Sequence, residues 1–345
     1  MDLLDIKPMF IINNNKLNKG VINMNNFKKI GLTALAASLV SVSANAGSLT
    51  ISGAASMNVG GYSGEGHDGG ATFSMGNQVT MSGSGELDNG MTVSISYQLD
   101  NNAATGAGPF DDHSVTVSSD ALGSLTLHGH GGGSATSAMD ATAAGNVWDT
   151  FDGIGAATGV THSNSAPGNN SLSYTMPTIM DGVAVNLSYK PQQSGNSIDS
   201  GTGYAVTYTG VEGLTLVYSN SDIVGSTSAL SGDQTAWKIS YAYGPVTATV
   251  TESEFDVETT TSDQEVSSMA VSYTVSDEIS VTYGTETIES TNVGHVDSEY
   301  TVVKGSYTSG GMTVSAQMKE AENIDHSTNA NADFEYWGLG LAFAF

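Results

Sequence analysis

The sequence predicts an all-β protein: a transmembrane antiparallel up-and-down β-barrel of about sixteen strands. Three observations predict it. Short segments alternate apolar and polar residues, as at the C-terminus, where every second residue from Trp337 to Phe345 is large and apolar. Such a strand suits a wall with lipid on one face and water on the other. The links between segments alternate between short and long, and beyond the N-terminal region no run of about 18 apolar residues predicts a spanning helix.

The composition agrees with strands and turns and excludes other classes. The chain has 345 residues, 42 glycines, no cysteine and 13% charged residues, so it offers neither a disulfide framework nor a thiolate metal site. Its formal net charge is -26, and all nine basic residues are lysines. Phosphate binding needs clustered cations, so nucleic acid is not an expected partner.

The N-terminal region has the pattern of an export signal. Lys28 and Lys29 precede an apolar run at 30–42, and small residues follow up to Ala46. Residues 1–23 are interpreted as an upstream extension from a misassigned start, with a long N-terminal region of the signal as the alternative. The predicted organisation is an extension at 1–23, a signal peptide at 24–46 and the mature barrel at 47–345.

Sixteen alternating segments follow one another in the mature chain. Tilted strands of nine to eleven residues cross the hydrocarbon core of a bilayer, and several of these segments are shorter. In order, the expected strands lie at 49–59, 77–85, 91–99, 114–118, 124–129, 171–176, 183–190, 204–209, 214–220, 235–243, 246–251, 266–275, 279–285, 300–307, 312–319 and 336–345.

The links between these segments predict how the strands connect. Seven are short turns built from Asp, Asn, Glu, Gly and Pro, residue types that favour tight turn geometry. Eight are longer and polar, and the third, at 130–170, is the longest. This alternation is expected of an up-and-down barrel with both termini on the side of the short turns.

Side-chain parity predicts a polar lumen. Between Val93 and Leu99 the apolar residues share one parity and the polar residues the other. The four lysines of the mature chain take the lumen parity. Exclusion from lipid alone predicts the same inward placement, because an outward lysine would cost about 2–4 kcal/mol at the midplane of the bilayer. These lysines are outnumbered by acids, so we expect a negative pore that favours cations. They are Lys190, Lys238, Lys304 and Lys319.

With its signal peptide, sixteen strands, terminal Phe345 and long third link, the chain resembles the Gram-negative general porins. The third link follows Leu125-Thr126-Leu127-His128-Gly129 and contains an acidic-aromatic stretch at 148–153. The resemblance implies an outer-membrane homotrimer for general diffusion of small hydrophilic solutes and ions, with the third loop folded into the lumen. It also implies contact with outer-membrane lipid and lipopolysaccharide, and recognition of Phe345 by the barrel-assembly machinery.

Carried over to this chain, the resemblance implies a constriction whose acidic side is Asp140, Asp149 and Asp152. Turn residues or calcium ligands are the alternative interpretation of these aspartates. The basic side departs from the family, because the chain has no arginine and carries His128 and His130, with inward parity, where a basic residue is expected. Histidine is mostly neutral at pH 7 to 8, so a weaker transverse field is expected.

Other features leave the prediction of a passive channel in place. No catalytic arrangement is recognisable from spacing, so the protein is not predicted to be an enzyme, and no cofactor is expected. Acids in the long loops, such as Glu252 and Glu254, are interpreted as solvated, with calcium binding as an alternative. The glycine-rich stretch at 128–133 is interpreted as a flexible base of the third loop. Two alternative functions are a solute-specific porin and a secreted acidic β-rich adhesin or surface-layer-like protein.

Overall fold

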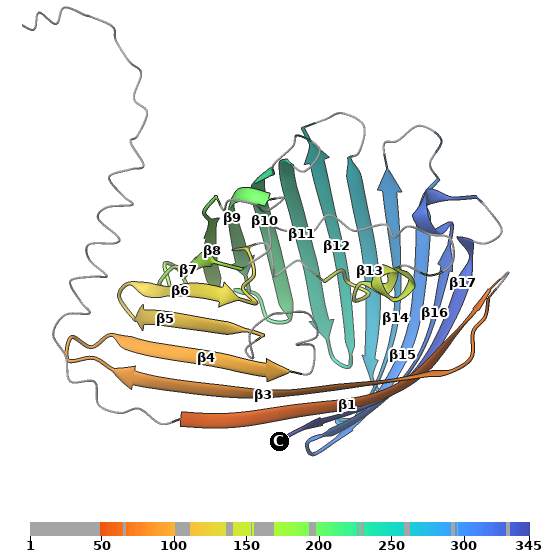
Figure 1. Ribbon diagram of the computed structural model, residues 1–345, viewed down its shortest axis with the longest axis horizontal. Coiled ribbons are helices and arrows are strands. Elements are labelled where there is room, and N and C mark those ends of the chain that lie inside the picture. Colours follow the sequence, from red (N-terminus) through yellow and green to blue (C-terminus); the bar gives the residue numbers. More distant parts are fainter. Residues whose placement is uncertain are drawn as a thin grey trace, which may run out of the picture. The chain divides into compact units, whose positions relative to one another are not determined.

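The structure is a computed structural model, and its described part is a closed antiparallel β-barrel (Figure 1). The predicted signal peptide, the predicted upstream extension and Asp140 lie outside the described residues. The described residues are 49–64, 67–100, 111–135, 141–152, 154, 169–192, 198–225, 228, 231–258, 263–290, 294, 296–328 and 332–345.

Sixteen long strands and one two-residue strand, β2, form a single sheet. Two short 3-10 helices, η2 (Val147–Phe151) and η4 (Ile324–His326), lie in the described parts of the loops. The strands are β1 (Leu49–Gly64), β2 (His67–Asp68), β3 (Thr72–Glu86), β4 (Thr92–Asp100), β5 (His113–Ser119), β6 (Gly123–His130), β7 (Ser171–Thr175), β8 (Val183–Lys190), β9 (Ile198–Tyr208), β10 (Leu214–Gly225), β11 (Gly232–Tyr243), β12 (Val246–Val257), β13 (Gln264–Thr274), β14 (Ile279–Ser290), β15 (Ser298–Ser309), β16 (Met312–Glu322) and β17 (Phe334–Ala344).

Each long strand pairs with the next along the chain, and β1 pairs with β17 to close the sheet. The register at the closure places Ala54 opposite Ala344 and Gly64 opposite Phe334. Main-chain hydrogen bonds continue one residue further, because Phe345 N donates to Gly53 O at 2.9 Å and Gly53 N donates to Phe345 O at 2.7 Å. Closure leaves no unpaired sheet edge, which a wall in lipid requires.

The number and order of the predicted strands are confirmed, but several strands are longer than predicted. β12 extends to Val257 and β14 to Ser290, well into the expected long links at 252–265 and 286–298. Beyond the hydrocarbon region both faces of a strand meet water or protein, so the alternation of apolar and polar residues weakens there although the main-chain ladder continues. The fourth strand, β5, is short, as predicted.

The two faces of the wall confirm the predicted parity. Large apolar side chains stand exposed on the outer face, among them Phe73, which is 86% exposed, Leu339 and Tyr283. Hydroxyl groups pair across neighbouring strands on the inner face, as Ser240 Oγ does with Thr249 Oγ1 at 2.9 Å. In the part of the chain that the structure describes, no helix is long and apolar enough to span a membrane.

The described part of the third loop at 141–152 folds into the barrel, as expected from the family resemblance. Its helix η2 packs against the inner face of β14, β15 and β16. Figure 1 shows this short helix within the curve of the sheet rather than at its upper rim. The loop therefore occupies part of the lumen cross-section.

Candidate functional site

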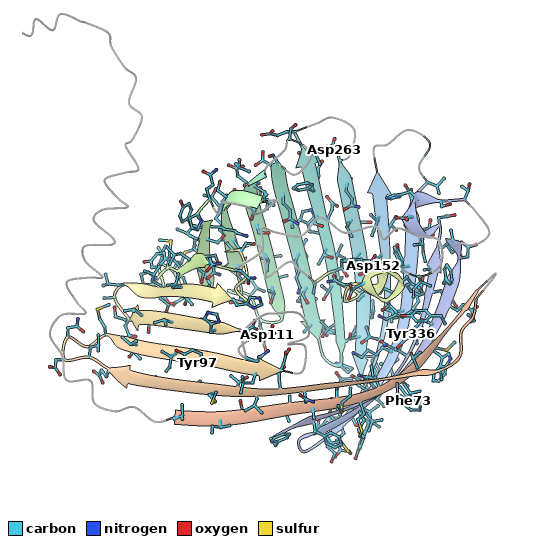
Figure 2. The ribbon with its side chains drawn as sticks, in the orientation of Figure 1. Phe73, Tyr97, Asp111, Asp152, Asp263 and Tyr336 are labelled. Carbon is cyan, nitrogen blue, oxygen red and sulfur yellow. The ribbon has the colours of Figure 1, made fainter. Side chains whose placement is uncertain are left out.

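Helix η2 is amphipathic, and this decides which side chains it presents to the lumen. Val147 and Phe151 are fully buried against the wall, and Trp148 is nearly so. Asp149 and Asp152 are exposed on the opposite side, and Figure 2 labels Asp152 at the end of the helix. Apolar burial on one side thus directs two carboxylates of the acidic-aromatic stretch toward the water of the lumen.

An apolar cluster inside the lumen holds the helix to the wall. The ring of Phe151 lies 6.2 Å from that of Tyr62 in an edge-to-face arrangement, and 6.1 Å from that of Tyr300. Tyr336 extends the cluster, with its ring 4.9 Å from that of Tyr62. The cluster also contains Val147, Trp148, Val266, Ile288, Val302, Ala321, Ile324 and Phe334.

Glu286 of β14 is the main polar anchor of the loop. Its side chain is 1% exposed, and it accepts hydrogen bonds from the main-chain N–H of Trp148 at 3.1 Å and from the hydroxyl of Thr142. The loop has only a short helix, so its main-chain donors need partners elsewhere. The buried carboxyl group of Glu286 accepts such a hydrogen bond, so neither the carboxyl group nor the main-chain N–H of Trp148 is left without a partner.

Hydroxyl groups of neighbouring strands anchor the segment before η2. Ala143 N donates to Thr251 Oγ1 of β12 at 2.9 Å, and Ala144 N donates to Ser268 Oγ of β13 at 3.0 Å. The approach is close at β14, where a Cβ on Gly284 would lie 2.7 Å from Ala144 Cβ. Glycine at this position therefore lets the loop lie directly on the wall.

Two further wall residues hold the end of η2 through Thr150. The hydroxyl of Tyr62 donates to Thr150 O at 2.8 Å, and the ammonium group of Lys319 donates to Thr150 Oγ1. Lys319 also interacts electrostatically with Asp149 and Glu286. Of the four lysines predicted to face the lumen, Lys319 is thus in contact with the third loop.

The other three lysines lie on the barrel wall at different depths. Lys190 ends β8 and is buried, Lys238 is half-buried on β11, and Lys304 is exposed on β15. Lys304 interacts electrostatically with Lys319 of the neighbouring strand β16. A role of these lysines in ion passage stays a prediction.

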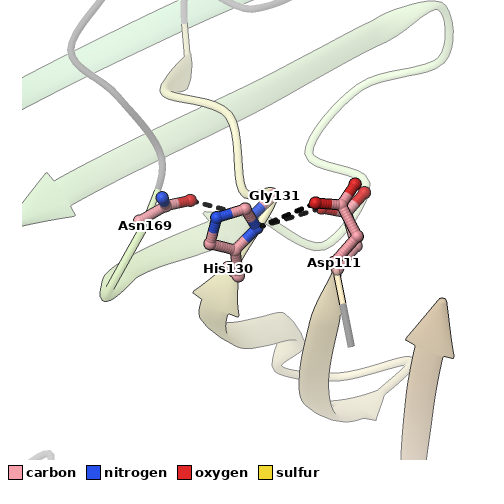
Figure 3. Close-up of polar contacts among 5 residues, drawn as sticks. Asp111, His130, Gly131 and Asn169 are labelled. Carbon is pink, nitrogen blue, oxygen red and sulfur yellow. Dashed lines mark hydrogen bonds and ion pairs between the residues drawn. The ribbon is translucent and has the colours of Figure 1, made fainter. Parts of the chain in front are cut away.

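The two histidines predicted to oppose the acids have other partners. His128 Nε2 lies 2.9 Å from Ser173 Oγ, and His130 Nδ1 lies 3.5 Å from Asp112 Oδ1 (Figure 3). Among the described residues, none of their polar contacts reaches Asp149 or Asp152. Their place opposite the acids in a constriction stays a prediction, and Asp140 cannot be placed because it lies outside the described residues.

Part of the inner face of the wall at β1, β3, β4 and β5 is lined by hydroxyl groups. Inward-facing serines and threonines there line a pocket of about 310 Å³, including Ser82, Ser96 and Thr116. Solutes that pass this part of the wall meet hydrogen-bonding groups without net charge.

Sequence reasoning missed Glu286, Tyr62, Tyr300 and Tyr336. Glu286 falls in the expected long link at 286–298. It shares the inward parity of Thr282 and Gly284, and this pattern could have predicted that the strand continues as far as Glu286. Tyr336 precedes Trp337 and so has the inward parity of β17, although the outward residues dominate the pattern there. These residues become recognisable only together, through their contacts with the third loop.

Comparisons with known proteins agree with the fold. The chain matches the family model for the Gram-negative porin over residues 31–345. No curated protein sequence matches it. An anion-selective porin from Comamonas acidovorans has a similar structure, with 14% identity, 87% of this chain and 100% of that chain covered, and a TM-score of 0.67.

Two further solved structures are similar. OmpF of Salmonella typhi in complex with daunomycin has 14% identity, covers 87% of this chain and 98% of its own, and gives a TM-score of 0.64. A loop L8 deletion mutant of OmpT, an outer membrane protein of Vibrio cholerae, has 16% identity, 87% and 100% coverage, and a TM-score of 0.61. Because the family match spans the whole barrel, the chain belongs to the Gram-negative porin family and is an outer-membrane β-barrel that passes small solutes and ions passively, not an enzyme.

Proposed function

We propose that this porin is a general diffusion channel that favours cations. The observation that carries the proposal is the exposure of Asp149 and Asp152 on the lumen side of η2, in a chain with a net charge of -26 and no arginine. Carboxylates that project into a narrowed, water-filled passage attract cations and repel anions. The fold does not decide the preference, since the similar porin from Comamonas acidovorans is anion-selective.

The zero-current potential across a planar bilayer under a salt gradient tests this proposal. The refolded protein without its signal peptide should give stepwise channels and a cation-favouring potential. The double variant Asp149→Asn with Asp152→Asn should shift that potential toward the anion side. The matched control is Asp181→Asn with Asp277→Asn, which removes two exposed carboxylates from short turns on the opposite side of the barrel.

Each arm of this experiment has a result that contradicts the proposal. Anion preference in the unmodified protein would refute the electrostatic account, although the channel itself would stand. An equal shift in the test and control variants would mean that the overall charge, rather than the two loop carboxylates, sets the selectivity.

We further propose that three barrels associate and that the barrel-assembly machinery reads Phe345. The outer face of β1 and β3 supports association, because it exposes Ile51, Met57, Phe73 and Met75, with Met57 directly opposite Met75. Phe345 is 79% exposed although its main chain is paired with Gly53, so the residue is accessible for recognition. A trimer band on an unheated gel that collapses on boiling tests association, and a single monomer band from folded protein would contradict it.

Divalent cations and lipopolysaccharide are proposed as partners of the acidic strand ends on the long-loop side. The supporting observation is a row of carboxylates on three adjacent strands, since Glu254 lies opposite Glu265 and Glu265 opposite Glu289. Like charges directly opposite one another destabilise a sheet, and bridging calcium would relieve the repulsion. Calcium should raise the unfolding temperature of the protein but not that of a Glu265→Gln variant to the same extent, and an absence of any rise would refute the proposal.

A further inference from the structure

Three potential metal ligands converge where β5 begins and β6 ends. His130 Nδ1 lies 3.5 Å from Asp112 Oδ1 and 3.9 Å from Asp111 Oδ1 (Figure 3). One ligand atom from each side chain lies within 4.8 Å of the others, and all three side chains are partly accessible to solvent. The cluster is separate from the anchors of the third loop on β12 to β16.

Main-chain contacts fix both aspartates beside β4. Asp111 N donates to Gln98 O at 2.9 Å, and Gln98 N donates to Asp112 O at 2.8 Å. Two adjacent residues held in this way keep their carboxyl groups near the histidine without relying on the side chains themselves. The arrangement is therefore built before any ion binds.

Gly131 makes the approach of Asp112 to His130 sterically feasible. It has a φ of +67°, and its N–H donates to Asn169 Oδ1 at 2.8 Å (Figure 3). A Cβ at Gly131 would lie 1.6 Å from Asp112 Oδ1, so any other residue would displace the carboxyl group. Flexibility of the glycine-rich stretch would not by itself require glycine at this position. The space that the Asp112 carboxyl group occupies does require it.

The electrostatics of the cluster favour a cation. Asp111 interacts electrostatically with the carboxylates of Asp100 and Asp112 as well as with His130. A second imidazole, that of His113, lies against Gly129, and its Nδ1 is buried with no hydrogen-bond partner among the described residues. Acids that crowd one another beside imidazoles are the surroundings in which proteins hold divalent metal ions.

We propose that Asp111, Asp112 and His130 form a binding site for a divalent transition-metal ion such as Zn²⁺. Metal–ligand distances of about 2.0–2.2 Å in a tetrahedral site place neighbouring ligand atoms about 3.3–3.5 Å apart. The distance of 3.5 Å from His130 Nδ1 to Asp112 Oδ1 already matches this spacing, and the distance of 3.9 Å to Asp111 Oδ1 exceeds it by at most about 0.6 Å. Small side-chain rotations therefore bring all three ligand atoms to the spacing that a bound metal ion needs. Three protein ligands leave a fourth position for water.

The bound ion links the end of the second long loop to the end of β6, where the third loop begins. Asp111 and Asp112 precede β5, whereas His130 is the last residue of β6 before the third loop. The ion therefore holds the starting point of the loop that narrows the lumen. This inference does not depend on the proposed cation preference, because it rests on the wall rather than on Asp149 and Asp152.

Calorimetric titration of ZnCl₂ into the metal-free, refolded protein of residues 47–345 at pH 7.5 tests the site. We expect one high-affinity Zn²⁺ per chain. Asp112→Asn and His130→Gln should each weaken that binding at least tenfold, since even the loss of an outer partner of a ligand typically costs 10- to 100-fold. The matched control is His128→Gln, on the same strand and hydrogen-bonded to Ser173, which should bind Zn²⁺ as the unmodified protein does.

A second measurement on the unmodified protein keeps the test independent of folding defects in the variants. Zn²⁺ should protect His130 from modification by diethyl pyrocarbonate, as read by peptide mass spectrometry. Unprotected His130 at saturating Zn²⁺ would overturn the proposal. Equal Zn²⁺ affinity in the unmodified protein and in His130→Gln would do so as well, and would mean that His130 only forms ion pairs with the two aspartates.

Discussion

Replacing Glu286 with alanine should loosen the third loop from the barrel wall without unfolding the barrel. Glu286 is the one residue of β14 whose carboxyl group accepts hydrogen bonds from both Thr142 and Trp148 among the contacts described. Alanine removes both acceptors and leaves the N–H of Trp148 facing an apolar surface. The strand itself keeps its main-chain ladder with β13 and β15.

The expected effect can be worked out from these contacts. A buried N–H left without a partner costs about 1–3 kcal/mol, and the lost hydroxyl bond costs about 1 kcal/mol more. Together, about 2–4 kcal/mol raise the equilibrium for local release of the loop about 30- to 700-fold, since each 1.4 kcal/mol is a factor of ten. Burial of Val147 and Phe151, about 1.5–3 kcal/mol each, opposes release. The loop should therefore remain docked in most molecules and open more often.

Amide hydrogen exchange read by mass spectrometry measures this opening directly. Peptides covering 141–152 should exchange 30-fold faster or more in Glu286→Ala, whereas peptides from β14 should be unchanged. Single-channel recordings should show a similar mean conductance with more frequent brief transitions to a larger one. The matched control is Glu320→Ala, which removes an exposed carboxyl group from β16, two strands away from β14 in the sheet.

One result would refute the reasoning. If exchange of the 141–152 segment in Glu286→Ala stayed within threefold of the unmodified protein, Glu286 would not anchor the loop, and apolar packing alone would hold it. Heat-dependent migration on a gel checks that the variant barrel is folded, so a folding defect cannot be mistaken for release of the loop.

Three further predictions follow from other contacts. Tyr62→Phe removes the hydrogen bond to Thr150 O and should speed exchange of the same segment about fivefold, for a cost of about 1 kcal/mol. Deletion of Phe345 removes both main-chain bonds to Gly53 and should lower the unfolding temperature of the barrel in a thermal melt. Zn²⁺ affinity should fall in titrations between pH 7.5 and 5.5, because the ligands bind the metal in their deprotonated forms and protons therefore compete with it.

Each of these three predictions has a result that would contradict it. Unchanged exchange in Tyr62→Phe would assign the anchoring at Thr150 to Lys319. An unaltered melt after deletion of Phe345 would mean that the β1 to β17 ladder closes the barrel without its last residue. A Zn²⁺ affinity independent of pH over this range would mean that no imidazole takes part in the site.

The sequence by itself determined the barrel. Alternation along each strand reports the environments of its two faces, and those environments are set locally by lipid and water. Strand number, the alternation of short and long links and the inward parity of the lysines therefore follow from the chain alone. The lumen exposure of Asp149 and Asp152 agrees with the constriction that the family resemblance implies, whereas their function stays a prediction.

Only the tertiary structure decided how the third loop is held and where the histidines find partners. Glu286 meets Trp148 across 138 residues of sequence, a separation over which no periodic pattern gives information. His130 meets Asp112 because β5 and β6 pair and Gly131 leaves space for a carboxyl group. Periodicity specifies the two faces of a strand, but which side chains meet inside a closed wall depends on register and closure, and these exist only in the folded barrel.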